Sequence, residues 1–191
     1  MSAGDRREQV LDVAADLTAE HGFNAVSIQS VARAAGISRP VVYEHFRNLT
    51  VLLDAVIERE TGRALQQATD TTLSDLALGD PATLMLASLR RYLQTVEHNP
   101  RTWRLVLMAP EGAPERLRES IRQGRQRILS QLTSAVVPLE LSPEAPFDPE
   151  LTARILSALA DEYARLLLSD PARYPVERLT AHARVIVERL A

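Results

Sequence analysis

The sequence has no cysteine and no lysine, only 4% aromatic residues, and no long apolar run. The absence of cysteine excludes disulfides and thiolate metal ligands. No apolar run approaches the roughly 18 residues that a membrane-spanning helix needs, and the polar start MSAGDRREQV does not resemble a signal peptide. We therefore expect a cytoplasmic protein with no membrane partner.

The charged residues also limit the class of protein. All 22 basic residues are arginine, and 25 acidic residues bring the net charge to −3. A chain of this charge is not a nonspecific nucleic-acid binder that depends on bulk positive charge. Each arginine still carries a planar fork of N–H donors that fits phosphate or guanine. The proportions, 46% hydrophobic and 25% charged, are typical of a globular protein of one domain or of a small domain joined to a larger one.

Helical signals run through the whole chain, and no stretch alternates apolar and polar residues over the length of a strand. Asp80, Asn99 and Asp148 each precede a proline, a pattern that marks helix starts, and Pro114 and Pro175 are expected to start helices without such a cap. The sequence therefore predicts an all-α fold of about nine helices. These are expected near residues 5–21, 27–34, 38–45, 48 into the 70s, 81–97, 100–108, 114–136, 149–169 and 175–190, with a proline-rich loop at 137–150.

Two of the predicted helices are short and close together, at 27–34 and 38–45, with Gly36 in the turn between them. Two helices joined by three or four residues form a helix-turn-helix. Ser38 fits the N-cap of the second helix. Pro40 then falls in the first turn, where proline breaks no intrahelical hydrogen bond. The proline is therefore expected to stiffen the end of a helix that enters the major groove.

The exposed side chains of that second helix suit DNA. Arg39 at its tip could reach a guanine edge or a phosphate, and Tyr43, one turn later, could donate its hydroxyl to a phosphate. Taken one at a time, Arg39, Tyr43 and His45 fit an ordinary solvated helix end better than a DNA contact. The whole motif favours the DNA-binding interpretation.

The stretch HGFNAVSIQSVARAAGISRPVVYEHFRNLTVLL resembles the DNA-binding domain of the tetracycline-repressor (TetR) family. The resemblance covers roughly residues 5–55, and the C-terminal part matches only in size and helical plan. It implies that Ser27 contacts a phosphate, that Ser38, Arg39 and Val41 read or flank bases, and that Tyr43 and His45 contact the backbone. The full set of DNA-binding residues that we expect is Ser27, Gln29, Ser38, Arg39, Pro40, Val41, Tyr43, His45 and Arg47.

One position departs from the family pattern. Family members commonly carry a phosphate-gripping lysine at the start of the fourth helix, where this chain has Leu49. Arg47 is the candidate replacement. Residues 1–47 hold five arginines and six acids, a net charge of −1, so we expect few phosphate contacts and a shallow salt dependence of DNA binding.

The C-terminal part is expected to sense a ligand and to dimerise, as the resemblance implies. The predicted helices at 149–169 and 175–190 are apolar around much of their circumference, which suits a four-helix interface between two copies as well as a monomer core. The interface residues that we predict are Leu156, Leu159, Tyr163, Leu166, Leu179, Ala183, Ile186 and Leu190.

A largely apolar small-molecule effector would need a pocket lined by apolar side chains with a few polar groups. The residues that could line it, or could equally form plain core, are Met85, Leu89, Tyr92, Trp103, Leu107, Met108 and Arg122. Arg122 shares one helix face with Arg118 and Arg125. That face is either solvated or, in part, directed at an anionic ligand.

No catalytic or metal-binding motif is present. The four histidines form no HExxH-type pair, no glycine-rich phosphate loop occurs, and Asp161 and Glu162 point in different directions on a helix. We expect no enzyme activity, no metal and no cofactor. The sequence predicts a helix-turn-helix domain at 1–50 and an effector and dimerisation domain at 51–191, in a homodimeric, ligand-responsive repressor of a palindromic operator. A scaffold protein that keeps this fold without binding DNA is the alternative.

Overall fold

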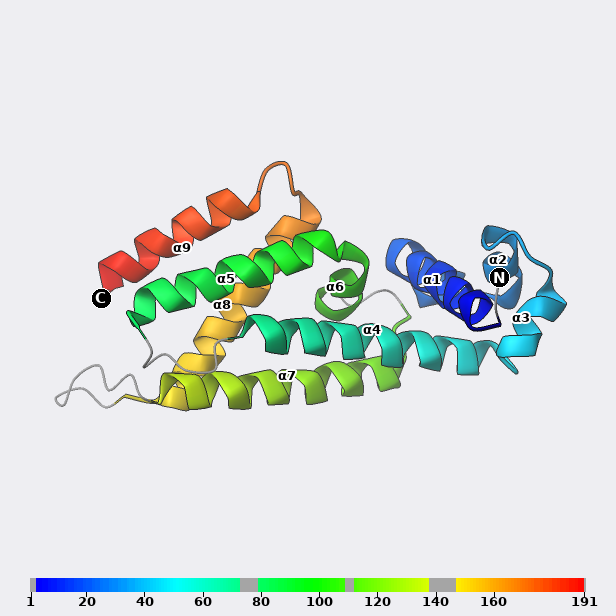
Figure 1. Ribbon diagram of the computed structural model, residues 1–191, viewed down its shortest axis with the longest axis horizontal. Helices are drawn as coiled ribbons and strands as arrows, with labels where there is room; N and C mark the ends of the chain where they lie inside the picture. The colour runs from blue at the N-terminus through cyan, green and yellow to red at the C-terminus, as the bar shows by residue number, and fades with distance from the viewer. Residues whose placement is uncertain (1–2, 73–78, 109–111, 138–146, 191) are drawn as a thin grey trace. The chain divides into compact units, whose positions relative to one another are not determined.

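The computed structural model describes residues 3–72, 79–108, 112–137 and 147–190 (Figure 1). These residues contain nine α-helices, a short 3-10 helix and no strand, so the all-α prediction is confirmed. The helices are α1 (Ala3–His21), η1 (Phe23–Ala25), α2 (Ile28–Ala34), α3 (Arg39–His45), α4 (Leu49–Thr71), α5 (Pro81–His98), α6 (Pro100–Leu107), α7 (Glu115–Val136), α8 (Pro149–Ser169) and α9 (Val176–Leu190). Most of the predicted loop at 137–150 lies outside the described residues. None of the described helices is long and apolar enough to cross a bilayer.

Two of the three Asx-Pro pairs cap helices as the sequence predicts. The Asp80 carboxylate accepts a bond from the Thr83 N–H at 2.9 Å, and the Asp148 carboxylate accepts one from the Leu151 N–H at 3.0 Å. Asn99 differs, because its side-chain amide donates to the Thr95 carbonyl at the end of α5, at 2.9 Å. A single residue separates α5 from α6, and its side chain closes the first helix instead of opening the second.

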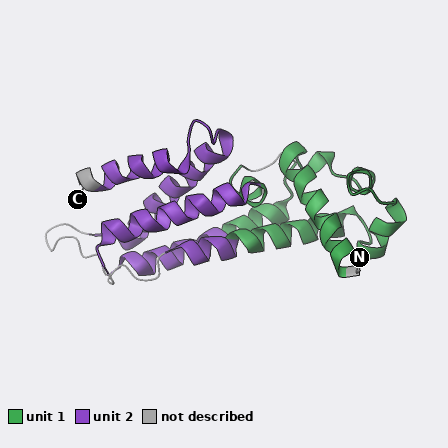
Figure 2. Cartoon of the chain, turned by 45° about the horizontal axis from the view of Figure 1, so that its top comes forward, with its two compact units in different colours: residues 1–64, 101–122 green, residues 65–100, 123–191 purple. Residues whose placement is uncertain are grey.

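The chain divides into two compact units, which Figure 2 distinguishes by colour. Unit 1 contains residues 1–64 and 101–122, and unit 2 contains residues 65–100 and 123–191. Unit 1 therefore joins the three N-terminal helices to the first part of α4, to α6 and to the start of α7. A functional boundary near residue 50 stays a prediction, because compactness alone does not define it.

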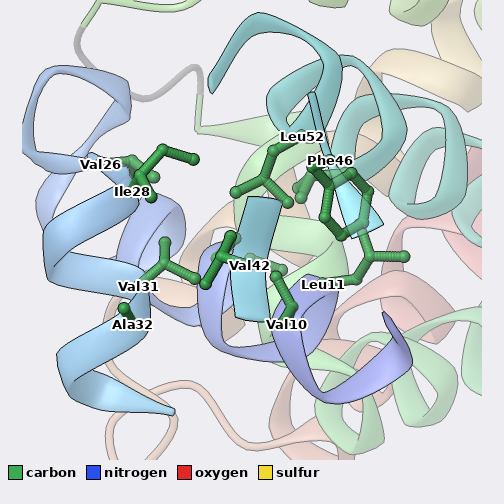
Figure 3. Packing of buried hydrophobic residues seen from close by; sticks show 12 residues of the cluster. Val10, Leu11, Val26, Ile28, Val31, Ala32, Val42, Phe46 and Leu52 are labelled. Atoms are coloured by element: carbon green, nitrogen blue, oxygen red, sulfur yellow. The ribbon is translucent and has the colours of Figure 1, made fainter. Parts of the chain in front are cut away.

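The core of unit 1 explains why the short helices α2 and α3 are stable. Figure 3 shows apolar side chains from α1, α2, α3 and α4 converging on one cluster. Val10, Val31, Val42 and Leu52 are fully buried, and Phe46 is 1% exposed. Each such side chain stabilises the fold by roughly 1.5–3 kcal/mol relative to exposure. Helices of seven residues are marginal on their own, so this packing holds them.

A second cluster in unit 1 attaches later segments of the chain to the first helices. Phe23 of η1 packs with Ile57 of α4, Leu105 of α6 and Leu117 of α7. Gly112, in the turn before α7, has φ +70, and a Cβ there would overlap the Asn24 side chain. The chain at Gly112 therefore packs tightly on Asn24, in the segment that precedes the helix-turn-helix.

Unit 2 is a helical bundle in which α5 packs against both α8 and α9. Leu93 and Val96 of α5 are fully buried. Leu167 of α8 and Leu179 of α9 are at most 4% exposed. This packing confirms helices in the C-terminal part and gives α8 and α9 a shared inner face.

Candidate nucleic-acid interface and effector region

The turn between α2 and α3 depends on Gly36. Its φ is +65, in the left-handed region that glycine adopts without strain, and no atom would obstruct a Cβ. The backbone requirement alone therefore selects glycine here. The Ile37 N–H then donates to the Ala32 carbonyl at 3.0 Å, which returns the chain toward α3.

The start of α2 is closed by a reciprocal pair of serines. The Ser27 hydroxyl oxygen accepts from the Ser30 N–H at 2.9 Å, and the Ser30 hydroxyl oxygen accepts from the Ser27 N–H at 2.8 Å. Both groups belong to a capping box, which stabilises a helix start. Ser27 is exposed, so its hydroxyl lies at the surface where the predicted phosphate contact would form.

The helix α3 has one buried face and one exposed face. Val42 and Phe46 are buried, whereas Tyr43 is 53% exposed. Ser38 occupies the N-cap with extended backbone but makes no side-chain cap bond, and Pro40 lies in the first turn as predicted. The Ser38 hydroxyl is therefore not used in closing the helix. The buried face fixes the rotation of α3 and presents its other face to solvent.

The nine predicted DNA-binding residues all belong to unit 1, and the structure buries none of them. Val41 and His45 are half-buried, and the other seven are exposed. The exposed ones are Ser27, Gln29, Ser38, Arg39, Pro40, Tyr43 and Arg47. They gather on the segments around the helix-turn-helix, while their roles in binding stay predictions.

The electrostatics of this surface differ from a simple charge count over residues 1–47. Asp12 of α1 lies 3.0 Å from both Arg59 and Arg101, and Glu8 lies 2.9 Å from Arg59. These arginines come from later segments, so Glu8 and Asp12 have cationic partners outside α1. Within the part of the chain that the structure describes, Arg39 and Arg47 have no ion-pair partner.

Leu49, at the position that departs from the family pattern, has a structural role. It is half-buried and packs against the core cluster of unit 1, while Asn48 caps α4 by accepting from the Val51 N–H at 2.9 Å. Arg47 is exposed one residue before that cap. The Arg47 cation is therefore available two residues before position 49, where family members commonly carry a lysine.

The predicted pocket residues fall in both units. Met85, Leu89 and Tyr92 of α5 are half-buried in unit 2. In unit 1, Trp103 is 3% exposed, Leu107 is 9% exposed and Met108 is 45% exposed. Arg122, also in unit 1, is exposed and forms ion pairs with Glu119 and Glu115.

Unit 2 contains a polar cluster that the sequence did not predict. The Tyr92 hydroxyl of α5 hydrogen-bonds the Asp161 carboxylate of α8, which also lies 2.7 Å from the Arg125 guanidinium of α7. Burial raises the pKa of Asp161, although Arg125, Arg165 and the Tyr92 hydrogen bond act in the opposite direction. The sequence signal was Asp161 itself, an acid on a largely apolar helix. Arg165 is a partner four residues away on the same helix, but Arg125 and Tyr92 lie 36 residues or more away in the sequence.

This cluster predicts a specific dependence of stability on alkaline pH. Burial, and then the charge of Asp161, raise the pKa of Tyr92 well above its ordinary value of about 10. The folded chain keeps this proton where the unfolded chain releases it, so stability is lost as the pH rises above about 10. Tyr92→Phe has no such proton and is expected to lose less free energy of unfolding between about pH 9 and pH 11.

Urea denaturation at a series of pH values measures this difference. Tyr43→Phe is the matched control, because it removes an exposed hydroxyl and is expected to follow the wild-type profile. If Tyr92→Phe also follows the wild-type profile, Tyr92 does not hold its proton more tightly in the folded chain.

The predicted dimer-interface residues differ in their exposure. Tyr163, Leu179 and Ala183 are buried within the chain, and the Tyr163 hydroxyl lies 2.8 Å from His182 Nδ1. The half-buried members are Leu156, Leu159, Leu166 and Ile186, whereas the Leu190 side chain lies outside the described residues. Three exposed apolar residues on the same two helices are not among the predicted interface residues: Leu151 at 54%, Ile155 at 60% and Val185 at 50%.

Comparison with known proteins identifies the kind of domain that unit 1 contains. The family model described as bacterial regulatory proteins, tetR family, matches residues 10–56.

In the described part of the chain, no group of three or more histidine and acidic residues could hold a metal ion.

Solved structures resemble the whole chain. A TetR-like transcriptional regulator from Rhodococcus sp. RHA1 is 22% identical, with a TM-score of 0.74 over 99% of this chain and 97% of that one. A tetR-family transcriptional regulator from Streptomyces coelicolor is 27% identical, with a TM-score of 0.69 over 100% and 82%. The TetR family regulator PfmR from Thermus thermophilus is 20% identical, with a TM-score of 0.67 over 95% and 93%.

Proposed function

Because this chain belongs to the tetR family of bacterial regulatory proteins, which are DNA-binding transcriptional regulators, we propose that it is a ligand-responsive repressor. It binds a palindromic operator as a homodimer in the cytoplasm, and it is not an enzyme. The observation that carries the DNA-binding part is the geometry of α3. Val42 and Phe46 are buried and fix the rotation of the helix. Arg39 and Tyr43 are exposed, and we propose that they contact DNA in the major groove.

Two recognition helices in a dimer of this kind lie about one turn of DNA, roughly 34–36 Å, apart. The purified protein should therefore enrich a palindromic sequence from a pool of random duplex DNA. Enrichment of a palindrome supports the proposal. If no sequence is enriched even at low salt, the competing proposal of a scaffold protein gains support, and the packing of Leu49 in the core favours it.

The exposed Arg47 is proposed to contact a phosphate. Arg47→Ala is expected to weaken binding of all sequences alike and to make the slope of log K against log salt shallower by about 1 per chain. Fluorescence anisotropy at several salt concentrations measures the slope. Arg118→Ala is the control, since Arg118 is an exposed arginine of unit 1 that pairs with Glu115. Equal slopes for both variants would exclude an Arg47–phosphate contact.

The homodimer is proposed to form through the outer faces of α8 and α9. Leu151, Ile155 and Val185 expose apolar surface there, and single monomers rarely leave large contiguous apolar patches uncovered. Ile155→Asp places a charge in such an interface and is expected to shift the protein to a monomer at micromolar concentration, measured by light scattering. Val137→Asp, at a site 52% exposed elsewhere in unit 2, should leave the dimer intact. A monomeric wild type would contradict this assignment.

The effector is proposed to be a largely apolar small molecule held in the C-terminal domain. A ligand that binds better to a conformer with unsuitable spacing of the recognition helices would release the DNA. Trp103 is the single tryptophan and is buried near the start of α6, so quenching of its fluorescence reports on such binding. A broad small-molecule library that gives neither quenching nor a thermal shift would count against an effector.

A further inference from the structure

The first turn of α6 reaches two helices of unit 1 at once. The Arg101 guanidinium donates to Asp12 at 3.0 Å and to Asp16 at 3.1 Å, two carboxylates one turn apart on α1. The next residue, Thr102, donates its hydroxyl to Glu60 of α4 at 2.5 Å. Arg101 also lies 3.8 Å from that Glu60 carboxylate.

Glu60 of α4 anchors the first turn of α6. Its side chain is 1% exposed, and the Arg59 guanidinium lies 2.9 Å from it. A buried carboxylate persists only when cations and hydrogen-bond donors satisfy it. The consecutive residues Arg101 and Thr102 are therefore held on α4, and the guanidinium fork of Arg101 extends from there to α1.

The pairs between Arg101 and α1 are well placed to orient the helix but not to stabilise the fold. Asp12 and Asp16 are about half exposed, and ion pairs of this kind contribute little to stability. Burial opposes the charge of Arg101, but the hydrogen bond to Asp16 and the carboxylates of Glu60 and Asp12 outweigh it and raise its pKa. A fork that binds two carboxylates at i and i+4 resists rotation and sliding of α1.

We infer that Arg101 is a positioning residue for DNA recognition, because it fixes α1 on α4 and α6 and so sets the direction in which unit 1 presents α3. This inference rests on the proposed function. In a dimer, the direction of each recognition helix determines which spacing between half-sites is accepted. Arg101 therefore acts on the choice of spacing, through α1, without touching DNA.

The test uses the palindrome selected by the wild-type protein and a series of duplexes in which the half-site spacing is changed by one or two base pairs. The wild type is expected to prefer one spacing. Arg101→Gln is expected to reduce that preference by about tenfold, with an unchanged melting temperature. A merely structural role would lower the melting temperature or weaken all duplexes equally.

Two further variants sharpen the result. The double variant Asp12→Asn, Asp16→Asn removes the same contact from the side of α1. It should therefore reduce the spacing preference as much as Arg101→Gln does, and combining all three substitutions should reduce the preference no further. Arg118→Gln, in the same unit, is the control and should keep the wild-type preference. If Arg101→Gln keeps the wild-type spacing preference, the inference about Arg101 is wrong while the proposed function stands. If the wild type binds no duplex, both the proposed function and this inference are wrong.

Discussion

Phe46→Ala is expected to lower the free energy of unfolding by about 3–5 kcal/mol, the usual cost of truncating a buried aromatic side chain. Phe46 is 1% exposed and lies in the cluster that joins α1, α2, α3 and α4. The Arg7 guanidinium also lies over its ring, 5.1 Å from the centroid. The substitution therefore leaves a cavity at the point where four helices meet, and urea denaturation measures the loss.

Tyr43→Ala is the matched control for that experiment. Tyr43 lies three residues earlier in the sequence but is 53% exposed, so its truncation should change stability by no more than about 0.5 kcal/mol. The same variant is expected to weaken DNA binding. If the two variants lose equal stability, α3 does not have the buried and exposed faces on which the proposed interface depends.

Arg39→Ala is expected to cost about 1–3 kcal/mol of operator binding and to relax the base preference at one position in each half-site. Arg39 is exposed at the first position of α3 and, among the described residues, has no acidic partner that would hold it away from DNA. Repeating the duplex selection with the variant identifies the relaxed position.

Arg33→Ala provides the comparison for Arg39→Ala. Arg33 is an exposed arginine at the end of α2, only six residues earlier, and lies outside the recognition helix. Its loss is expected to leave every base preference intact. If Arg39→Ala also keeps the wild-type base preferences, Arg39 contacts the backbone or solvent and does not read a base.

The sequence predicted the helices well because their signals are local. Gly22 ends α1, Gly36 provides the turn, and proline follows the caps of α5 and α8, so most ends agree within two residues. The exception is the Asn99 side chain, which caps the end of α5 and not the start of α6. Which of the two helices it caps depends on how closely they follow each other in the sequence. The buried face of α4 likewise follows the local spacing of its apolar residues, with Leu52, Val56 and Ile57 fully buried.

The long-range polar contacts could not be predicted in the same way. Arg101 bonds Asp12 and Asp16 across 89 and 85 residues, and no periodicity links such positions. The charge count over residues 1–47 therefore left out the arginines of α4 and α6 that pair with Glu8, Asp12 and Asp16 of α1. The bond between Tyr92 and Asp161 also joins helices that are distant in the sequence.

The proposed function requires that α3 reads a specific DNA sequence. The most direct measurement is the ratio of affinities for the selected palindrome and for a scrambled duplex, taken by fluorescence anisotropy at physiological salt. We expect a ratio of about a thousand or more for the wild type, and a much smaller ratio for the variant that combines Arg39→Ala with Tyr43→Ala. Equal affinities of the wild type for both duplexes would contradict it.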